Sequence, residues 1–139
     1  MRIPTESEEQ QSLMRYVRAE LCRYPELNML FHVPNEGERR ISTGGRMKNE
    51  GLRRGVPDLF LDVARCGYHG LRIELKRIRY SRRLPEQKEW ILRLNSYGYA
   101  AAFCYGWTEA WELIHAYLTG EDKVIKSYIS RSVKEAKAG

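Results

Sequence analysis

Two short apolar runs joined by a glycine-bearing segment constrain the fold of this chain most strongly. They lie within residues 55–76, and Gly67 and Gly70 stand between them. From Leu71 to Lys76, apolar residues alternate with charged ones, and this period of two is typical of a β-strand with one buried face. The two runs therefore predict a β-hairpin with strands at about 58–63 and 71–77.

The predicted hairpin brings two carboxylates and a lysine together. Glu74 and Lys76 are two residues apart and share one face of the strand, and hairpin closure places Asp58 opposite them. Close carboxylates repel one another, and a hard divalent cation relieves that repulsion. Mg²⁺ prefers oxygen ligands and keeps several waters, so Asp58, Glu74 and the carbonyl of Leu75 could hold it. Lys76 could activate water or stabilise charge on a phosphoryl group, which predicts phosphodiester hydrolysis.

Helices and further strands are expected around the hairpin, in a single domain over residues 1–139 with its core at about 8–118. Residues 1–7 are expected to form a disordered lead, and Ser7 to cap a helix over 8–23. A looser basic tail is expected after Gly120. The other expected elements are a strand at 30–33, a short helix near 43–51, a helix from 85 to about 97, a buried strand at 99–105 and a helix at 108–118.

Basic residues cluster on both sides of the hairpin. The chain of 139 residues has a net charge of +6, which favours a polyanionic partner, nucleic acid first. The alternative is a solvated charged surface without a ligand. The candidate DNA-binding residues are Arg39, Arg40, Arg46, Lys48, Arg53, Arg54, Arg77, Arg79, Arg82 and Arg83.

Three widely spaced cysteines without a CxxC pair predict reduced thiols and a cytoplasmic protein. The apolar runs are too short for a signal peptide or a membrane span, so no membrane partner is expected. No organic cofactor is expected either.

The pair Pro57-Asp58 followed by Glu74-Leu75-Lys76 resembles the PD-(D/E)xK nuclease superfamily. The wider sequence resembles the VRR-NUC family more closely, in its small stand-alone form from phages and bacteria. This resemblance implies an α/β restriction-endonuclease-like fold, in which helices flank a central mixed β-sheet, and dependence on Mg²⁺ or Mn²⁺. The segments that carry it are 8–10, 34–37, 45–51, 55–59, 67–70, 74–76 and 85–87.

The resemblance also implies roles for individual residues. Asp58 and Glu74 would be metal ligands and Lys76 the catalytic lysine. A first-helix acid, Glu9 with Glu8 as the competitor, would complete the site, and Gln87 would support the substrate or a metal-bound water.

Stand-alone members are similar to Holliday-junction resolvases and act as homodimers on four-way DNA junctions. A two-fold dimer suits a junction because it offers two related active sites. The location expected from this likeness is the cytoplasm, that of the host if a phage encodes the protein. Flaps and other DNA structures remain open as substrates. The candidate dimer contacts are Trp107, Trp111 and Tyr117.

A nucleic-acid-binding module without catalysis is the rival interpretation from another class. It would keep the basic surface and use the carboxylates only in structural ion pairs. The presence of Asp58, Glu74 and Lys76 together argues against it. Asp62 is expected to be a solvated acid and His69 a turn residue.

Overall fold

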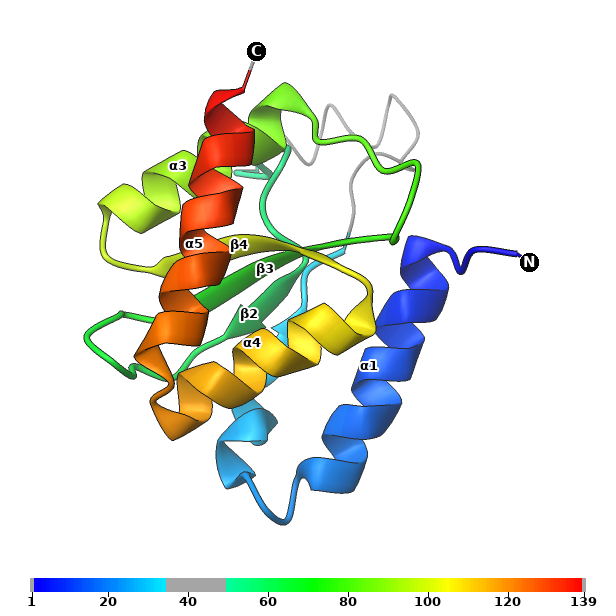
Figure 1. Ribbon diagram of the computed structural model, residues 1–139, viewed down its shortest axis with the longest axis vertical. Helices are drawn as coiled ribbons and strands as arrows, with labels where there is room; N and C mark the ends of the chain where they lie inside the picture. The colour runs from blue at the N-terminus through cyan, green and yellow to red at the C-terminus, as the bar shows by residue number, and fades with distance from the viewer. Residues whose placement is uncertain (1, 35–49, 139) are drawn as a thin grey trace.

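The computed structural model describes residues 2–34 and 50–138, which form one mixed β-sheet with helices on both faces (Figure 1). The strand order is β1-β2-β3-β4, with antiparallel pairs β1/β2 and β2/β3 and a parallel pair β3/β4. The predicted α/β class is therefore confirmed. The elements are α1 (Glu6–Glu20), the 3₁₀ helix η1 (Pro25–Met29), β1 (Leu30–His32), β2 (Leu59–Leu61), β3 (Leu71–Lys76), α3 (Pro85–Ser96), β4 (Ala100–Tyr105), α4 (Trp107–Thr119) and α5 (Asp122–Lys137).

The predicted hairpin is present as β2 and β3, with Leu59 opposite Ile73. Its strands are shorter than expected, because Asp58 precedes β2 and the chain leaves the ladder after Leu61. At the turn, Cys66 and Gly67 both adopt positive φ angles, of 54° and 83°. The turn thus lies where the sequence placed it.

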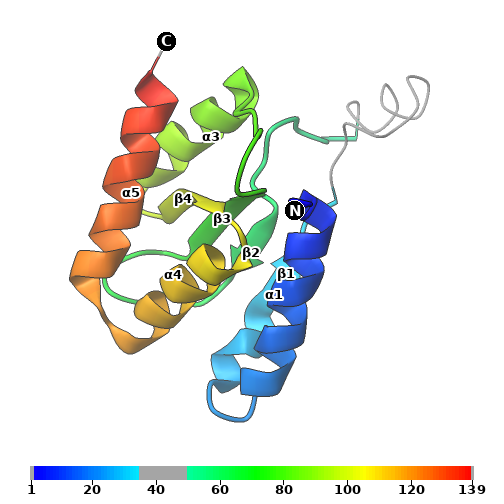
Figure 2. The ribbon, with the colours of Figure 1, turned by 45° about the vertical axis from the view of Figure 1, so that its right-hand side comes forward.

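The two faces of β3 meet different environments. Leu71, Ile73 and Leu75 join the main core, which α1 and α4 also line. The opposite face carries Glu74 and Lys76, and there α3 and α5 cover β4 (Figure 2). Every residue of β3 is buried, so its charged face is enclosed as well as its apolar face.

Helix α1 begins earlier than predicted. Its N-cap is Thr5, whose hydroxyl accepts from the Glu8 amide while the Glu8 carboxylate accepts from the Thr5 amide. This reciprocal capping box satisfies two amides at the helix start, whereas Ser7 lies inside the helix. Residues 6 and 7 are therefore helical, and the prediction of a disordered lead through Ser7 was wrong.

Helix α5 replaces the looser tail expected after Gly120. Ile125, Tyr128, Ser132 and Ala136 recur at helical spacing and are buried against α3, α4 and β4. Lysines and small polar residues lie between these four positions. This basic composition hides the narrow buried face of the helix in the sequence. The prediction of a tail was wrong for that reason.

The other predicted elements agree with the structure to within a few residues, apart from the short helix near 43–51, most of which lies outside the described residues. Tyr97, the C-cap of α3, is 73% exposed. Within the described residues, no helix has the length and apolarity to cross a membrane.

The outer edge of β4 is closed by side chains from three helices. Asn95 of α3 bonds both the amide and the carbonyl of Ala101. Ser132 of α5 accepts from the Phe103 amide at 2.9 Å, and Glu109 of α4 accepts from the Tyr105 amide. Such contacts satisfy groups that an edge strand would otherwise present to another strand.

Replacing Ser132 by alanine is expected to lower the free energy of unfolding by about 1–3 kcal/mol, because it leaves the buried Phe103 amide without an acceptor. Urea denaturation measures the change. Ser130→Ala, an exposed position on the same helix, is the matched control and should be neutral. Equal stability of the two variants would contradict this account of the β4 edge.

Candidate active site

Asp58 lies between the ends of two strands. Its Oδ2 accepts from the Leu75 amide of β3 at 2.9 Å. Its backbone carbonyl accepts from the Val33 amide at 2.7 Å, and His32 Nδ1 lies 3.2 Å from the same oxygen. Asp58 is thereby fixed just beyond the β2 ladder, beside the end of β3 that carries Glu74 and Lys76. His32 therefore lies beside the site as well.

The segment before Asp58 packs tightly on the start of α3. Gly55 has a φ of +88°, and a Cβ at this position would lie 2.6 Å from the Glu86 backbone carbon. Trp90 donates its indole N–H to the Arg54 carbonyl. A glycine is required here because only its backbone allows both the positive φ and the close approach. Asp58 and the start of α3 are thus held together.

Gln87 links the charged side chains. Its Nε2 donates to Glu74 Oε2 at 3.1 Å, while its Oε1 accepts from Lys76 Nζ and from the Leu84 amide, both at 2.9 Å. Lys76 Nζ also donates to the Arg82 carbonyl and lies 3.8 Å from Glu74 Oε2. The structure therefore brings together Asp58, Glu74, Lys76 and Gln87, as the sequence predicted.

The two carboxyl groups are difficult to ionise together. Burial raises the pKa of Glu74 well above its ordinary value, and the nearby charge of Asp58 raises it further, while Lys76 opposes both effects. Burial likewise raises the pKa of Asp58, although the Leu75 amide and a hydrogen bond with Glu74 lower it. Without a cation, burial and mutual repulsion therefore favour a proton on Glu74, shared with Asp58 through their hydrogen bond.

The acids of α1 occupy three different environments. Glu8 is engaged by Arg2 and by the capping box, away from the carboxylate pair. Glu9 is buried, and its Oε1 accepts from the Trp107 amide at the start of α4, where a helix end favours negative charge. Its Oε2 is buried without a hydrogen-bond partner.

Glu6, which the sequence interpretation missed, lies within electrostatic range of the pair. Partial burial raises its pKa most, and the charge of Asp58 adds to the rise while Lys76 and Arg77 oppose it. Glu6 and Glu9 are three residues apart and share a helix face. The signal that could have found Glu6 was the capping box at Thr5, which extends the helix to include it.

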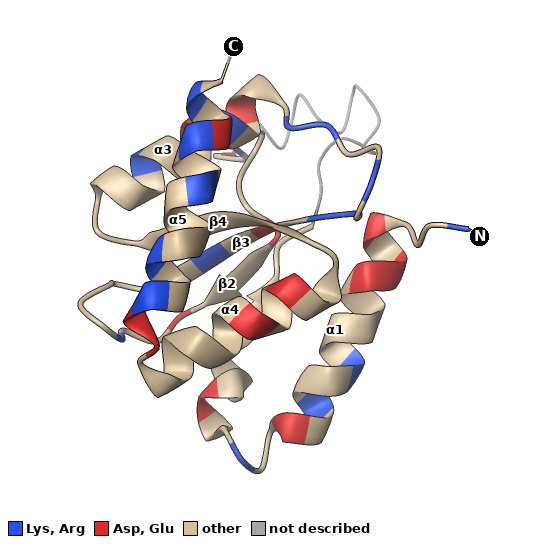
Figure 3. Ribbon diagram, in the orientation of Figure 1, with Lys and Arg blue, Asp and Glu red and all other residues tan. Residues whose placement is uncertain are grey.

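The basic residues predicted to bind DNA divide into groups. Arg39, Arg40, Arg46 and Lys48 lie outside the described residues. The strip between β3 and α3 is strongly basic (Figure 3). Within it, Arg77 and Arg83 are half-buried and bonded to the Ile3 carbonyl and the Tyr105 hydroxyl.

The remaining described arginines are more exposed. Arg54 forms an exposed ion pair with Glu86. Arg53, Arg79 and Arg82 have exposed side chains and are the freest to meet a phosphate backbone.

Asp62 is exposed, as expected of a solvated acid. It pairs with Arg72 at 3.0 Å, and Arg72 packs over the ring of Phe60. Tyr117 is fully buried and donates to the Val63 carbonyl, so it is unavailable as a dimer contact.

The donor set fits a hard divalent cation. In the described part of the chain, no three His, Cys, Asp or Glu side chains form a ready-made metal cage. Mg²⁺, however, is commonly held by one or two carboxylates and several waters. The buried Glu74 and the partly buried Asp58 provide two carboxylates whose mutual repulsion a cation would relieve.

Comparisons with known proteins converge on one family. The model of the VRR-NUC domain matches residues 5–108. A solved structure of a VRR_NUC domain protein is similar to this chain with a TM-score of 0.75 and 32% identity, covering 86% of this chain and 92% of the other. No protein in the curated comparison matches. The family match ends within the first turn of α4, so α5 lies beyond it.

Glu74→Gln is expected to stabilise the metal-free protein at neutral pH. A raised pKa means that folded Glu74 keeps a proton that the unfolded chain releases above its ordinary value of 4.5, so wild-type stability should fall as the pH rises. In EDTA at about pH 8, the variant should melt at least about 3 °C above wild type. Mn²⁺ should then raise the Tm of wild type but not of the variant.

Calorimetry across the pH range makes the measurement. Glu89→Gln, an exposed glutamate on α3, is the control and should follow wild type. A wild-type stability that rises between about pH 5 and pH 8 in EDTA would contradict the shared-proton account.

Proposed function

Because the chain belongs to the VRR-NUC family of nucleases, we propose that it is a Mg²⁺- or Mn²⁺-dependent DNA endonuclease that cuts branched DNA such as four-way junctions. The observation that carries this proposal is the pair formed by the buried Glu74 and the partly buried Asp58 beside Lys76, with Gln87 bonded to both Glu74 and Lys76. A structural ion pair would need one carboxylate, whereas two carboxylates beside one ammonium leave a negative charge once both are ionised, and a bound cation would balance that charge.

The cation-binding groups would be Asp58, Glu74 and the Leu75 carbonyl. The N–H and C=O of a strand residue point toward the same neighbouring strand. The Leu75 amide donates to Asp58, so the Leu75 carbonyl faces the same side. When bound, the cation would neutralise charge on a phosphoryl oxygen and acidify its water.

Lys76 would act on the reacting phosphate or its attacking water. Two acceptors, Gln87 Oε1 and the Arg82 carbonyl, fix the Nζ position. An ammonium held in a site with little water stabilises developing negative charge without reorganising first. Gln87 holds Lys76 beside Glu74 and so serves as a positioning residue.

The DNA backbone would lie along the basic strip that follows β3. Arg79 and Arg82 are exposed there, and Arg53 is exposed on the segment before Asp58. Contacts of this kind release counterions, so binding should weaken steeply with salt. A homodimer would offer two such sites, which suits paired cuts at a junction.

A cleavage assay tests the proposal. Labelled four-way junction, flap and linear duplex are incubated with wild type or Lys76→Ala, in Mg²⁺, Mn²⁺ or EDTA. Cleavage is expected with a metal only, and Lys76→Ala should lower the rate by about 100-fold or more. Lys123→Ala, an exposed lysine of α5, is the control and should cut normally.

Two outcomes of this assay would count against the proposal in different ways. If wild type binds junction DNA but cuts nothing with either metal, the chain is a binding module and the nuclease proposal is wrong. If Lys76→Ala cuts as fast as wild type, the activity stands and the assigned site is wrong.

We further propose that the first-helix acid of this site is Glu6 rather than Glu9. Glu6 interacts electrostatically with Asp58 and Lys76, whereas Glu9 already holds the start of α4. Glu6→Gln should weaken Mn²⁺ binding by about 10-fold or more, and Glu9→Gln should leave it unchanged. Calorimetric titration with Mn²⁺ measures both; the reverse pattern would assign the role to the unpartnered Oε2 of Glu9.

A further inference from the structure

Tyr80 is presented to solvent at the tip of the segment between β3 and α3. Its side chain is 83% exposed, the most of the large hydrophobic residues that the structure describes. Its φ of 63° lies in the left-handed region, which residues other than glycine rarely adopt. An exposed aromatic ring on an uncommon backbone conformation has no evident role in the core, and such conformations cluster at functional sites.

The segment that carries Tyr80 is held on both sides of its tip. Before Tyr80, Arg77 donates to the Ile3 carbonyl, and Ser81 Oγ donates back to the Arg77 carbonyl at 2.7 Å. After it, the Arg82 carbonyl accepts from Lys76 Nζ at 2.5 Å.

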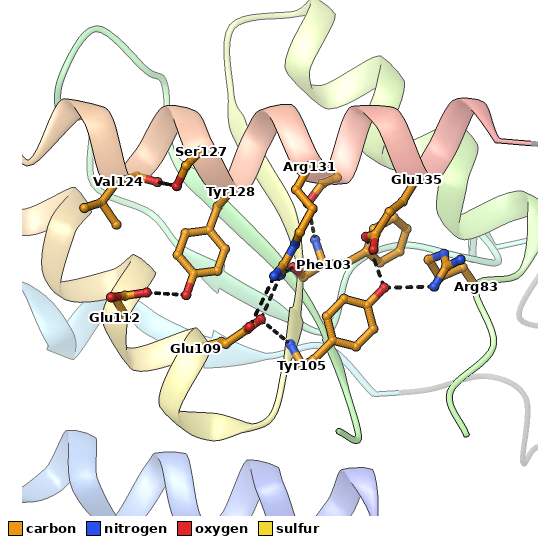
Figure 4. Close-up of polar contacts among 11 residues, drawn as sticks. Arg83, Phe103, Tyr105, Glu109, Glu112, Val124, Ser127, Tyr128, Arg131 and Glu135 are labelled. Carbon is orange, nitrogen blue, oxygen red and sulfur yellow. Dashed lines mark hydrogen bonds and ion pairs between the residues drawn. The ribbon is translucent and has the colours of Figure 1, made fainter. Parts of the chain in front are cut away.

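Arg83 extends this support to the C-terminal helix. It donates to the Tyr105 hydroxyl, which in turn donates to Glu135 of α5 (Figure 4). The exposed ring of Tyr80 therefore projects from a loop, residues 77–84, whose two ends are held by hydrogen bonds.

The same contacts place Tyr80 close to the proposed chemistry. Tyr80 is four positions after Lys76 in the chain, so the two Cα atoms are at most about 14 Å apart, a few base steps of DNA. Arg79 and Arg82 flank it with exposed cations, and no acidic residue lies between Glu74 and Glu86. These surroundings favour a polyanion over an apolar protein partner.

We propose that Tyr80 stacks on an unstacked base beside the scissile phosphate and sets a preference for DNA with a flap or gap over continuous duplex. This inference rests on the proposed nuclease function and names the feature of the substrate that its site selects. An aromatic ring binds any base whose face is accessible, and a continuous duplex hides those faces between neighbours. Arg79 and Arg82 bind the adjoining phosphates without regard to sequence.

Binding in EDTA separates this role from catalysis. Fluorescence anisotropy with flapped, gapped and linear DNA of equal length gives three affinities for each variant. Tyr80→Ala should weaken binding of flapped and gapped DNA by about 5- to 100-fold and leave linear duplex unchanged. Tyr80→Phe keeps the ring and should match wild type. A 2-aminopurine at the unpaired base should be quenched by wild type and by Tyr80→Phe, but not by Tyr80→Ala.

Two more variants control for the loop and for exposure. Asparagine tolerates the left-handed conformation, so Tyr80→Asn keeps the loop while removing the ring and should bind as Tyr80→Ala does. Tyr97→Ala removes an exposed tyrosine, 73% accessible, at the opposite end of α3, and should bind all three DNAs as wild type does.

The results distinguish failure of this inference from failure of the proposed function. If wild type cuts branched DNA but Tyr80→Ala keeps its preference and its quenching, only the role of Tyr80 is overturned. An equal loss of affinity for all three DNAs overturns it too, because Tyr80 would then be a general contact. If wild type neither binds nor cuts any DNA, both proposals are overturned.

Discussion

The constraint around which this molecule is built is a buried carboxylate, Glu74, that lies beside a buried ammonium, Lys76, and a second, partly buried carboxylate, Asp58. A charge enclosed in this way must be bonded to other polar groups, or its burial would destabilise the fold. The amide of Gln87 meets that need because it donates to Glu74 and accepts from Lys76 at once. An ionised carboxylate could only accept, and an ammonium or guanidinium could only donate. The start of α3 is therefore tied to β3 by the site itself.

Strand β3 places the side chains that stabilise the core on one face and the proposed reactive side chains on the other. One face packs Leu71, Ile73 and Leu75 into the core, and alternation alone then puts Glu74 and Lys76 on the other. A shift in register by one residue would turn Glu74 and Lys76 into the core and move Leu71, Ile73 and Leu75 to the opposite face of the sheet. Hydrophobic packing thus sets the position of the reactive groups.

Sequence reasoning reached the parts of the site that local rules determine. Alternation and a turn placed Asp58 with Glu74 and Lys76, and the likeness to known nucleases added Gln87. Glu6 was missed because the predicted start of the first helix lay two residues too late. The helix after Gly120 was missed because lysines mask its narrow apolar stripe. The bonds of Glu9 and Arg83 to distant segments depend on tertiary packing, which no local pattern encodes.

The edge of β4 gains its side-chain partners in a fixed order during synthesis, and this order determines when the edge is protected from aggregation. Asn95 precedes β4, but Glu109, Arg131 and Ser132 are synthesised after it. Until residues 131 and 132 emerge from the ribosome, the amide and carbonyl of Phe103 have none of their final partners, although β4 can already pair with β3. A nascent chain that stalls before α5 would expose a strand edge with unpaired backbone groups, which could pair with a strand of another chain. The last helix, α5, therefore protects the edge of β4 from aggregation only after it has been synthesised and has packed on the strand.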